Sequence, residues 1–406
     1  MPKVLLFAAT TGYQLRSFAE AAERAGLELR LATDRCHVMD DPWGDGAIAL
    51  RFNNAEGSAR RAAAQAGQVD GIAAVGDRPA FLAAVTAARL GLPFHSPDAV
   101  RAASNKFLAR EHFRKAGMPA PRFFRISPDE DAEAASSRAP YPCVLKPLTM
   151  SGSRGVIRAD NPAEFTAACA RIRALLAGAR AAEQERFVQV EEFIPGREFA
   201  VEGIVSRGQF RALAIFDKPD PLDGPFFEET IYVTPSREPA GVQDALTSAA
   251  ARAASALGLT HGPVHTEMRL NRQGVWVLEA APRPIGGLCA RALPGLEELI
   301  LRHAAGLDPG ELHLDGEALG VMMIPIPREG VYVDVRGIED APTTQGIVDA
   351  VITAKQGHHL QPLPEGHSYL GFLFSRAATP AAAEEALRRA HSRLEFDIQT
   401  ALPVIR

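Results

Sequence analysis

The chain has 406 residues, which is too long for one typical hydrophobic core, so we expect two or three domains. Its charges are mixed, with a formal net charge of -5 at pH 7, which argues against nucleic acid or an anionic membrane as the main partner. No apolar run approaches a membrane-spanning length, and the four cysteines lack any Cys-x-x-Cys spacing. The composition therefore favours a cytoplasmic protein without a disulfide framework or a zinc site.

The first hundred residues alternate between strand and helix patterns. Residues 3–10 are predicted to form a buried strand, and residues 17–25 a helix. A second strand at 28–32, a third at 71–75 and a helix at 79–90 continue the alternation. Strand, helix and strand with short links are typical of a parallel sheet.

The loops after Thr10 and Gly76 lie at the carboxyl ends of predicted strands, where ligands usually bind in such sheets. A dinucleotide site is disfavoured, because no Gly-x-Gly-x-x-Gly follows the first strand. The apolar start MPKVLLFAATTG is short and leads straight into a turn. We interpret it as the first strand and not as a signal peptide.

Two lysines precede a glycine-rich loop. Lys106 lies on the second of two predicted helices, where a solvated lysine is the ordinary interpretation. Lys146 ends an apolar strand, and a mostly buried lysine needs a partner. Backbone N–H groups of the following loop can approach phosphate oxygens closely, and the lysine ahead of it favours phosphate binding over a simple hairpin turn. The loop residues are Ser151, Gly152, Ser153 and Gly155.

The segment FVQVEEFIPGREFAVEGIV carries Glu191, Glu192 and Glu198 through an apolar frame. Its turn at Pro195-Gly196 can offer a backbone carbonyl and an N–H to the edge of an adenine ring. Glu198 can accept hydrogen bonds from ribose hydroxyls. The alternative is an edge strand with solvated acids.

A long loop is predicted at 217–235, DKPDPLDGPFFEETIYVTP, between helices at 162–177 and 241–257. Loops of this length inside a domain tend to be functional or disordered. The buried-looking pair Phe226-Phe227 favours a functional loop.

Residues 261–292, HGPVHTEMRLNRQGVWVLEAAPRPIGGLCARA, are predicted to form a β-hairpin with strands at 264–270 and 275–280. Each strand carries one carboxylate among apolar residues, Glu267 on the first and Glu279 on the second. An unpaired charge in such a setting costs several kcal/mol, so something must compensate both acids.

The hairpin register decides whether the two glutamates meet. A three-residue loop with Gly274 in the left-handed position pairs Leu270 with Trp276, and therefore Glu267 with Glu279. The residues expected to share this face are His265, Glu267, Arg269, Val277, Glu279 and Ala281.

Two neighbouring carboxylates repel each other unless a divalent cation lies between them, and hard oxygen ligands of this kind suit Mg²⁺. The hairpin alone leaves a second interpretation open. In that interpretation the glutamates pair with arginines such as Arg269 and Arg283.

A smaller αβ unit is predicted after Leu312. Its expected elements are strands at 320–327, 330–337 and 369–377 and a helix at 381–394. His358, His359 and His367 lack an ordered ligand spacing, so a metal site at these histidines is disfavoured.

The two lysines with their glycine-rich loop, the segment EEFIPGRE and the pair Glu267/Glu279 occur in the order expected of the ATP-grasp ligases, which the chain resembles over roughly residues 1–310. The resemblance rests on several motifs in order and not on one. Within that superfamily the chain is similar to the L-amino acid ligases, or dipeptide synthetases. The shared segments are GPFFEETIYVTPS, GPVHTEMRL…VLEAAPRPIGG and GFLFSRA…AEEALRRAH.

The resemblance implies a mixed α/β and α+β architecture, the ATP-grasp fold. A Rossmann-like parallel-sheet domain is expected at 1–100 and a two-lobed ATP-grasp domain at 101–310. The second domain would include a mobile lid at about 120–192. A small αβ C-terminal domain is expected at 311–406.

The resemblance also implies roles for individual residues. Arg283 would hold the carboxylate substrate and its acyl phosphate, Glu229 would face the amino end of a substrate, and Lys146 completes the catalytic set. Glu267 and Glu279 would bind Mg²⁺, with Mn²⁺ as an alternative. The implied ATP-binding residues are Lys106, Lys146, Ser151, Gly152, Ser153, Gly155, Glu191, Glu192, Phe193, Ile194, Glu198 and Leu278. The implied substrate-binding residues are Glu229, Tyr232, Arg283, Gly286 and Gly287.

Two positions depart from the pattern of relatives. Ala281 stands where many ATP-grasp enzymes have an asparagine that binds metal, which moves the resemblance away from biotin carboxylase and D-alanine ligase. Tyr232 stands where relatives often carry histidine, which argues against an imidazole in substrate recognition. Gly286 and Gly287 follow Arg283 closely, and two residues without side chains leave room for a bulky substrate.

The implied activity is that of an ATP-dependent carboxylate–amine ligase. It would form an amide (peptide) bond between L-amino acids, or between an amino acid and an amine, through an acyl phosphate, and release ADP and phosphate. Two alternatives stay open: an ATP-grasp carboxylase or purine-pathway ligase related to biotin carboxylase, and a non-catalytic ATP-binding protein. The expected partners are ATP and small carboxylate and amine substrates, with neither nucleic acid nor membrane. A homodimer is the assembly that the resemblance suggests.

Overall fold

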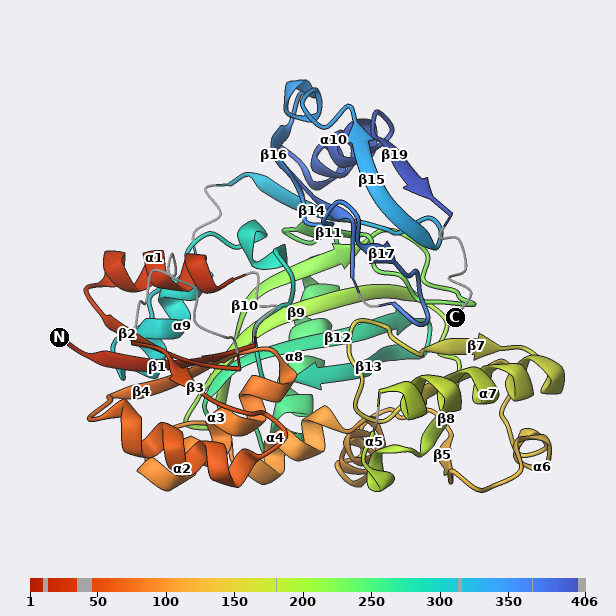
Figure 1. Ribbon diagram of the computed structural model, residues 1–406, viewed down its shortest axis with the longest axis horizontal. Coiled ribbons are helices and arrows are strands. Elements are labelled where there is room, and N and C mark those ends of the chain that lie inside the picture. The colour runs from red at the N-terminus through yellow and green to blue at the C-terminus, as the bar shows by residue number, and fades with distance from the viewer. Residues whose placement is uncertain (10–13, 35–45, 180, 313–315, 367, 401–406) are drawn as a thin grey trace.

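The computed structural model describes residues 1–9, 14–34, 46–179, 181–312, 316–366 and 368–400. Thr10 and His367 lie outside the described residues. Three lobes surround a long central sheet (Figure 1). Within the described residues, no helix combines the length and the apolar character needed to cross a membrane.

The N-terminal lobe is a parallel sheet with helices on both faces, as predicted. Its strands, in the order β3-β2-β1-β4, are β1 (Lys3–Ala8), β2 (Glu28–Thr33), β3 (Ile48–Ala49) and β4 (Gly71–Val75). Alternate side chains of β1 enter two cores: Leu6 packs with α1, and Phe7 packs with α2 and α3. These helices are α1 (Leu15–Ala25), α2 (Ala55–Ala66) and α3 (Asp77–Leu90).

The second lobe is an antiparallel sheet covered by a helix. Its strands, in the order β5-β8-β6-β7, are β5 (Phe123–Ile126), β6 (Cys143–Pro147), β7 (Ile157–Ala159) and β8 (Val188–Glu192). Helix α7 (Pro162–Gly178) buries Phe165 and Ile172 against β6 and β8. The same part of the sequence holds α6 (Ala132–Ser136), the 3-10 turn η2 (Glu183–Glu185) and two helices that precede the lobe. These are α4 (Pro97–Ser104), which packs on α3 and on β13 (Gly274–Ala281) of the central sheet, and α5 (Lys106–Lys115).

The central sheet has eight strands in the described part of the chain, in the order β13-β12-β9-β10-β11-β14-β18-β16. Five belong to the middle of the sequence: β9 (Arg197–Ser206), β10 (Gln209–Lys218), β11 (Ile231–Thr234), β12 (Gly262–Asn271) and β13 (Gly274–Ala281). Helix α8 (Ala240–Leu257) packs against this sheet through Leu246 and Ala250. The chain then forms η3 (Cys289–Ala292) and α9 (Leu296–Ala304), and α9 lies against α1.

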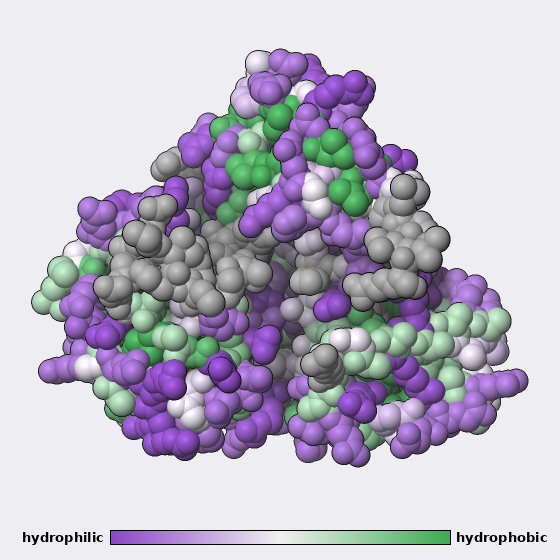
Figure 2. All heavy atoms as spheres, in the orientation of Figure 1, coloured by the Kyte–Doolittle hydropathy of each residue, from purple (hydrophilic) through white to green (hydrophobic). Residues whose placement is uncertain are grey.

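The C-terminal strands continue the central sheet, although we expected a separate small unit. Ile231 of β11 pairs with Met322 of β14, and this contact joins the two regions. The continuing strands are β14 (Ala318–Ile324), β16 (Ile347–Ile352) and β18 (Gly371–Ala377). A separate sheet contains β15 (Gly330–Arg336), β17 (His359–Leu360) and β19 (Glu395–Gln399). Helix α10 (Pro380–His391) packs on β14 and β18 of the central sheet, and η4 (Ala341–Thr343) packs on β16. Figure 2 shows apolar side chains gathered on this lobe of a mostly polar face.

The β12–β13 hairpin has a different register from the predicted one. Leu270 pairs with Val275 and not with Trp276, because the connecting loop is shorter by one residue. A bulge at Leu278 then inserts one extra residue into β13 and restores the pairing of Glu267 with Glu279. The prediction for the two acids is therefore confirmed. It was wrong for Val277, which lies opposite Met268 on the other face.

Candidate active site

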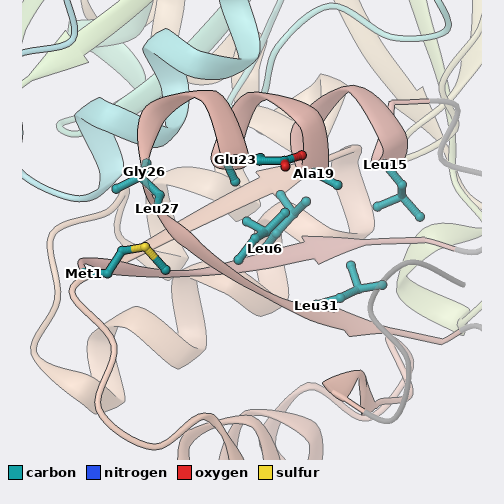
Figure 3. Close-up of a pocket in the computed structure, with 10 residues that line it drawn as sticks. Met1, Leu6, Leu15, Ala19, Glu23, Gly26, Leu27 and Leu31 are labelled. Carbon is teal, nitrogen blue, oxygen red and sulfur yellow. The ribbon is translucent and has the colours of Figure 1, made fainter.

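Two cavities differ in the functional groups that line them. The first, about 330 Å³, lies beside α1 and is lined mainly by aliphatic side chains such as Leu6, Leu15 and Leu31, so it offers no set of catalytic groups (Figure 3). The second, about 500 Å³, is lined by residues of the central sheet and of all three lobes. All the site residues predicted from the sequence line this second cavity except Gly155.

Gly155, at the end of the glycine-rich loop, does not line the cavity. Its N–H donates to the carbonyl oxygen of Pro364 at 2.8 Å, so this group is used within the protein and does not face a phosphate. A Cβ at Gly155 would stand 2.7 Å from the ring of Pro147, and φ is +71°, so glycine is required by close packing. Ser151, Gly152 and Ser153, by contrast, do line the cavity.

Lys146 is the second-last residue of β6 and forms an ion pair with Glu191 of β8. Arg110 of α5 holds the same carboxylate with two hydrogen bonds, from Nε at 2.9 Å and from a terminal nitrogen at 3.2 Å. Burial lowers the pKa of Lys146 to about 8. Burial alone would raise the pKa of Glu191, but Arg110 and Lys146 outweigh it and lower the pKa to about 2.

Lys106 is the first residue of α5 and is not the solvated lysine of the ordinary interpretation. Its Nζ donates to the carbonyl oxygen of Met150 at 2.7 Å and lies 3.2 Å from Oε2 of Glu279. The lysine therefore reaches both the glycine-rich loop and one acid of the hairpin, and it lines the cavity with Lys146.

The segment that was expected to bind adenine already uses several of its backbone groups in hydrogen bonds within the protein. The N–H groups of Glu192 and Phe193 donate to the carbonyl oxygens of Arg122 and Pro142, each at 2.9 Å. Arg269 donates to the carbonyl oxygen of Ile194 at 2.7 Å.

Glu198, the expected ribose ligand, is not a solvated acid on an edge strand. One oxygen pairs with Lys218 and the other accepts from Nε of Arg269 at 3.0 Å. The side chain nevertheless lines the cavity, and so does Leu278.

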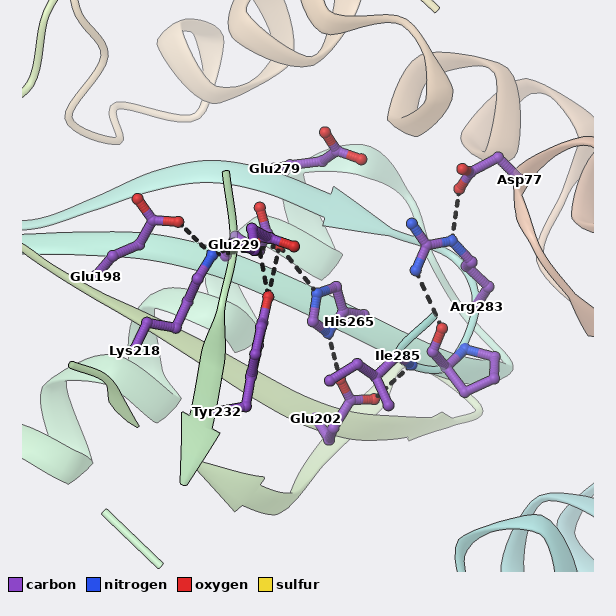
Figure 4. A network of polar contacts seen from close by, with 12 residues as sticks. Asp77, Glu198, Glu202, Lys218, Glu229, Tyr232, His265, Glu279, Arg283 and Ile285 are labelled. Atoms are coloured by element: carbon purple, nitrogen blue, oxygen red, sulfur yellow. Dashed lines mark hydrogen bonds and ion pairs between the residues drawn. The ribbon is translucent and has the colours of Figure 1, made fainter. Parts of the chain in front are cut away.

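Lys218 was missed by sequence reasoning, although it lies at the centre of the acids. Its Nζ pairs with Glu198 and Glu229 and lies 3.7 Å from Glu267 (Figure 4). Tyr232, which belongs to β11 and not to a loop, donates its hydroxyl to Oε1 of Glu229 at 2.9 Å. The signal in the sequence was a lysine at the end of an apolar strand, the same pattern that drew attention to Lys146.

An imidazole does reach the site, from His265 of β12 and not from position 232. Nδ1 of His265 bonds to the carboxylate of Glu202, and Nε2 lies 3.3 Å from Oε1 of Glu267. Burial lowers the pKa of His265, but Glu202 outweighs it and raises the pKa to about 10, so both ring nitrogens donate. Glu202 of β9 also accepts the N–H of Ile285 at 3.2 Å, which ties the segment after Arg283 to β9.

Arg283 follows β13 and points toward Asp77, the first residue of α3 (Figure 4). Its Nε donates to Oδ1 of Asp77 at 2.7 Å, and one terminal nitrogen donates to the carbonyl oxygen of Pro284 at 3.1 Å. Asp77 was not predicted as a site residue, although the loop after Gly76 was predicted as a ligand position. Arg269 pairs with Glu198, so neither of these arginines forms its ion pair with a hairpin acid, as the second interpretation required.

Glu267 and Glu279 suit a magnesium ion. They are register partners on neighbouring strands, and their side chains are 23% and 28% exposed in the cavity that the two lysines line. Carboxylate oxygens are the ligands that Mg²⁺ prefers. In the described part of the chain, His358 and His359 belong to no group of metal-ligating side chains.

The two glycines after Arg283 differ in the space around them. A Cβ at Gly286 would meet nothing within 4 Å, whereas a Cβ at Gly287 would lie 3.3 Å from the ring of Phe372. Gly287 also has φ of +61°, which strains any side chain. The C-terminal lobe contributes lining residues that sequence reasoning missed: Met323, Ser368, Tyr369 and Phe372.

Comparisons with known proteins identify two domains in the chain. Residues 139–292 match the family model of the ATP-grasp domain, and residues 322–399 match that of the L-amino acid ligase C-terminal domain 2. The alanine–anticapsin ligase of Bacillus amyloliquefaciens is 28% identical over 245 residues, which cover 56% of this chain and 49% of that protein. The chain spans about half the length of the first curated relatives it matches.

Solved structures show the same fold. The L-amino acid ligase from Bacillus licheniformis has a TM-score of 0.83 and 23% identity, covering 98% of this chain and 99% of that chain. The N5-carboxyaminoimidazole ribonucleotide synthetase from Thermotoga maritima has a TM-score of 0.71 and 18% identity, covering 98% of this chain and 100% of that chain. The chain thus carries an ATP-grasp domain at 139–292, followed by an L-amino acid ligase C-terminal domain 2 at 322–399.

Proposed function

We propose that the chain is an ATP-dependent carboxylate–amine ligase that joins two amino acids, or an amino acid and an amine. One observation carries the proposal: two lysines, a pair of facing carboxylates and an arginine line the same cavity. The C-terminal domain of the L-amino acid ligase type supports amino acids as substrates.

The first step activates the carboxylate. A carboxylate oxygen attacks the γ-phosphorus of ATP, the bond from that phosphorus to the bridging oxygen breaks, and ADP leaves. Lys106 and Lys146 bind the phosphates, and the fixed charges of the site stabilise the transition state without reorganisation. Mg²⁺ bound by Glu267 and Glu279 would neutralise phosphate charge.

Arg283 orients the reacting carboxylate. Its fork of N–H donors matches the two oxygens of a carboxylate, which a lysine does not do. Asp77 holds Nε, so the guanidinium enters the cavity in one orientation. An oriented carboxylate reacts faster because less freedom remains to be lost in the transition state.

The second step forms the amide. The amine nitrogen attacks the carbonyl carbon of the acyl phosphate, the bond from that carbon to the phosphate oxygen breaks, and phosphate leaves with the electron pair. The amine attacks in its neutral form, and the proton that it loses passes to the leaving phosphate. Glu229 lies on the cavity wall with its Oε1 fixed by Lys218 and Tyr232, which suits it to bind the amino group of a substrate.

Water must be kept from the acyl phosphate, since hydrolysis would waste ATP. The glycine-rich loop belongs to the second lobe and bonds to the C-terminal lobe through Gly155 and Pro364. Nε of Arg154 also donates to the carbonyl oxygen of Glu365 at 2.8 Å. These contacts support a lid that closes over the nucleotide.

A panel of amino acids and amines with MgATP tests the proposal. We expect phosphate release that depends on a pair of substrates, together with a product whose mass equals their sum less one water. The Glu279→Gln variant should lose both signals. ADP release that depends on bicarbonate would favour the carboxylase instead. ATP binding with no turnover for any substrate pair would favour the non-catalytic protein.

A further inference from the structure

Three carboxylates converge on one point of the central sheet. Glu198 of β9, Glu267 of β12 and Glu229, which lies just before β11, each place an oxygen within 4.8 Å of the others. Three hard oxygens at this spacing would suit a divalent cation, and without a counter-charge they would repel one another.

An ammonium group already lies among these oxygens. Nζ of Lys218 pairs with Glu198 and Glu229 and lies 3.7 Å from Glu267, and the side chain is 2% exposed (Figure 4). Register holds it there, because Lys218 of β10 is the direct partner of Glu198. The aromatic ring of Tyr232, with its centroid 5.1 Å from Nζ, lies against the same charge.

The three converging acids and Glu279 thereby differ in their partners. Glu198 has both oxygens engaged, one by Lys218 and one by Arg269. Glu229 has Oε1 engaged by Lys218 and Tyr232. Glu267 keeps the longest contact with Lys218 and faces Glu279 across the hairpin.

We propose that Lys218 is a positioning residue that acts as a built-in cation. Its ammonium occupies the place that a divalent ion would take among Glu198, Glu229 and Glu267. The ion is therefore confined to the pair Glu267/Glu279, and Glu229 stays free of metal to bind the substrate amine. This inference rests on the proposed function for the role of Glu229, but its test needs neither nucleotide nor turnover.

The test is binding of Mn²⁺ alone to the full chain, measured by the paramagnetic signal of free Mn²⁺ and by calorimetry. Lys218→Met removes the charge and keeps a side chain of similar length. We expect Mn²⁺ to bind at least about tenfold more tightly than to the wild type, because one nearby positive charge is lost and three acids become available. Lys355→Met, at an exposed lysine, should leave the affinity unchanged.

Two further variants separate charge from shape. Lys218→Arg keeps the charge and should bind Mn²⁺ as weakly as the wild type, and the double variant Lys218→Met/Glu229→Gln should lose the gain. The inference is overturned if Lys218→Met binds Mn²⁺ no better than the wild type, or if Lys218→Arg binds it as tightly as Lys218→Met.

A test in the wild-type background covers the case in which Lys218→Met does not fold. Glu229→Gln should weaken Mn²⁺ binding far less than Glu267→Gln or Glu279→Gln does, because Lys218 keeps the ion from direct contact with this acid and only a nearby charge is lost. A loss in Glu229→Gln as large as in those two variants would contradict the inference. A failure of the proposed function would appear instead as absent ligase activity with these Mn²⁺ affinities intact.

Discussion

The pKa of Lys146 makes ATP binding depend on pH in a range where few lysines titrate. Burial lowers this pKa to about 8 in the free protein, so the ammonium is charged below pH 8 and neutral above it. A bound phosphate anion favours the charged form. Binding of ATP should therefore take up a proton above pH 8, and the affinity should fall as the pH rises.

The size of the effect follows from the position of the pKa. At pH 9.5, which is 1.5 units above it, only about 3% of the free protein carries the charge, so the affinity should fall about 30-fold, or about 2 kcal/mol. Calorimetry with a non-hydrolysable ATP analogue and Mg²⁺ between pH 7 and pH 9.5 measures this directly. Buffers with different heats of ionisation report the proton that is taken up.

Two variants assign the effect to one side chain. Lys146→Met should bind the analogue weakly and without this pH dependence, whereas Lys106→Met should bind weakly but keep it. A flat affinity in the wild type between pH 7 and pH 9.5, or the same fall in Lys146→Met, would refute the reasoning.

Three other predictions concern the surroundings of the site. The pKa of Glu191 is lowered from 4.5 to about 2, so its contribution of about 3 kcal/mol to stability is present above about pH 4.5 and is lost as the pH falls through 2. Urea unfolding of Glu191→Gln should show a loss of at least that size at pH 7 and a smaller one at pH 3, and equal losses would argue against it. Gly286→Leu fills open space beside the reacting carboxylate, whereas Gly287→Ala also strains the backbone. The first should lower kcat/KM for bulky carboxylates much more than for small ones, and unchanged selectivity in a substrate panel would count against the idea. Asp77→Asn should raise KM for the carboxylate substrate about tenfold, about 1.4 kcal/mol, because Arg283 loses its orienting partner. KM for ATP should stay the same in this variant, and a parallel rise in both constants would indicate a general loss of structure.

Local patterns in the sequence were enough for most elements. In the N-terminal lobe, β1, β2, β4, α1 and α3 follow from apolar periodicity and from glycine at helix ends, whereas β3 and α2 were not predicted. The meeting of Glu267 and Glu279 was also predictable, because both belong to one hairpin and short loops restrict its register. The bulge at Leu278 was not predictable, since a bulge depends on packing against the neighbouring strand and leaves no fixed mark in composition.

Contacts between distant segments could not be predicted. Asp77 and Arg283 are 206 residues apart, and no residue pattern in either segment indicates that their side chains meet. Lys218 on β10 comes within 3.7 Å of Glu267 on β12 because both strands are neighbours of β9 in the sheet. This strand order is not encoded in any local pattern. Pairing of β11 with β14, which extends the central sheet into the C-terminal lobe, likewise depends on strand order and not on local propensity.

The central claim is that the paired acids and the two lysines serve the transfer of a phosphoryl group from ATP to an organic acid. A carboxylate substrate labelled with ¹⁸O tests it most directly, through mass spectrometry of the inorganic phosphate that is released. We predict that one labelled oxygen appears in phosphate for each amide formed, and that Glu279→Gln releases no labelled phosphate. Amide formed together with unlabelled phosphate would contradict the account.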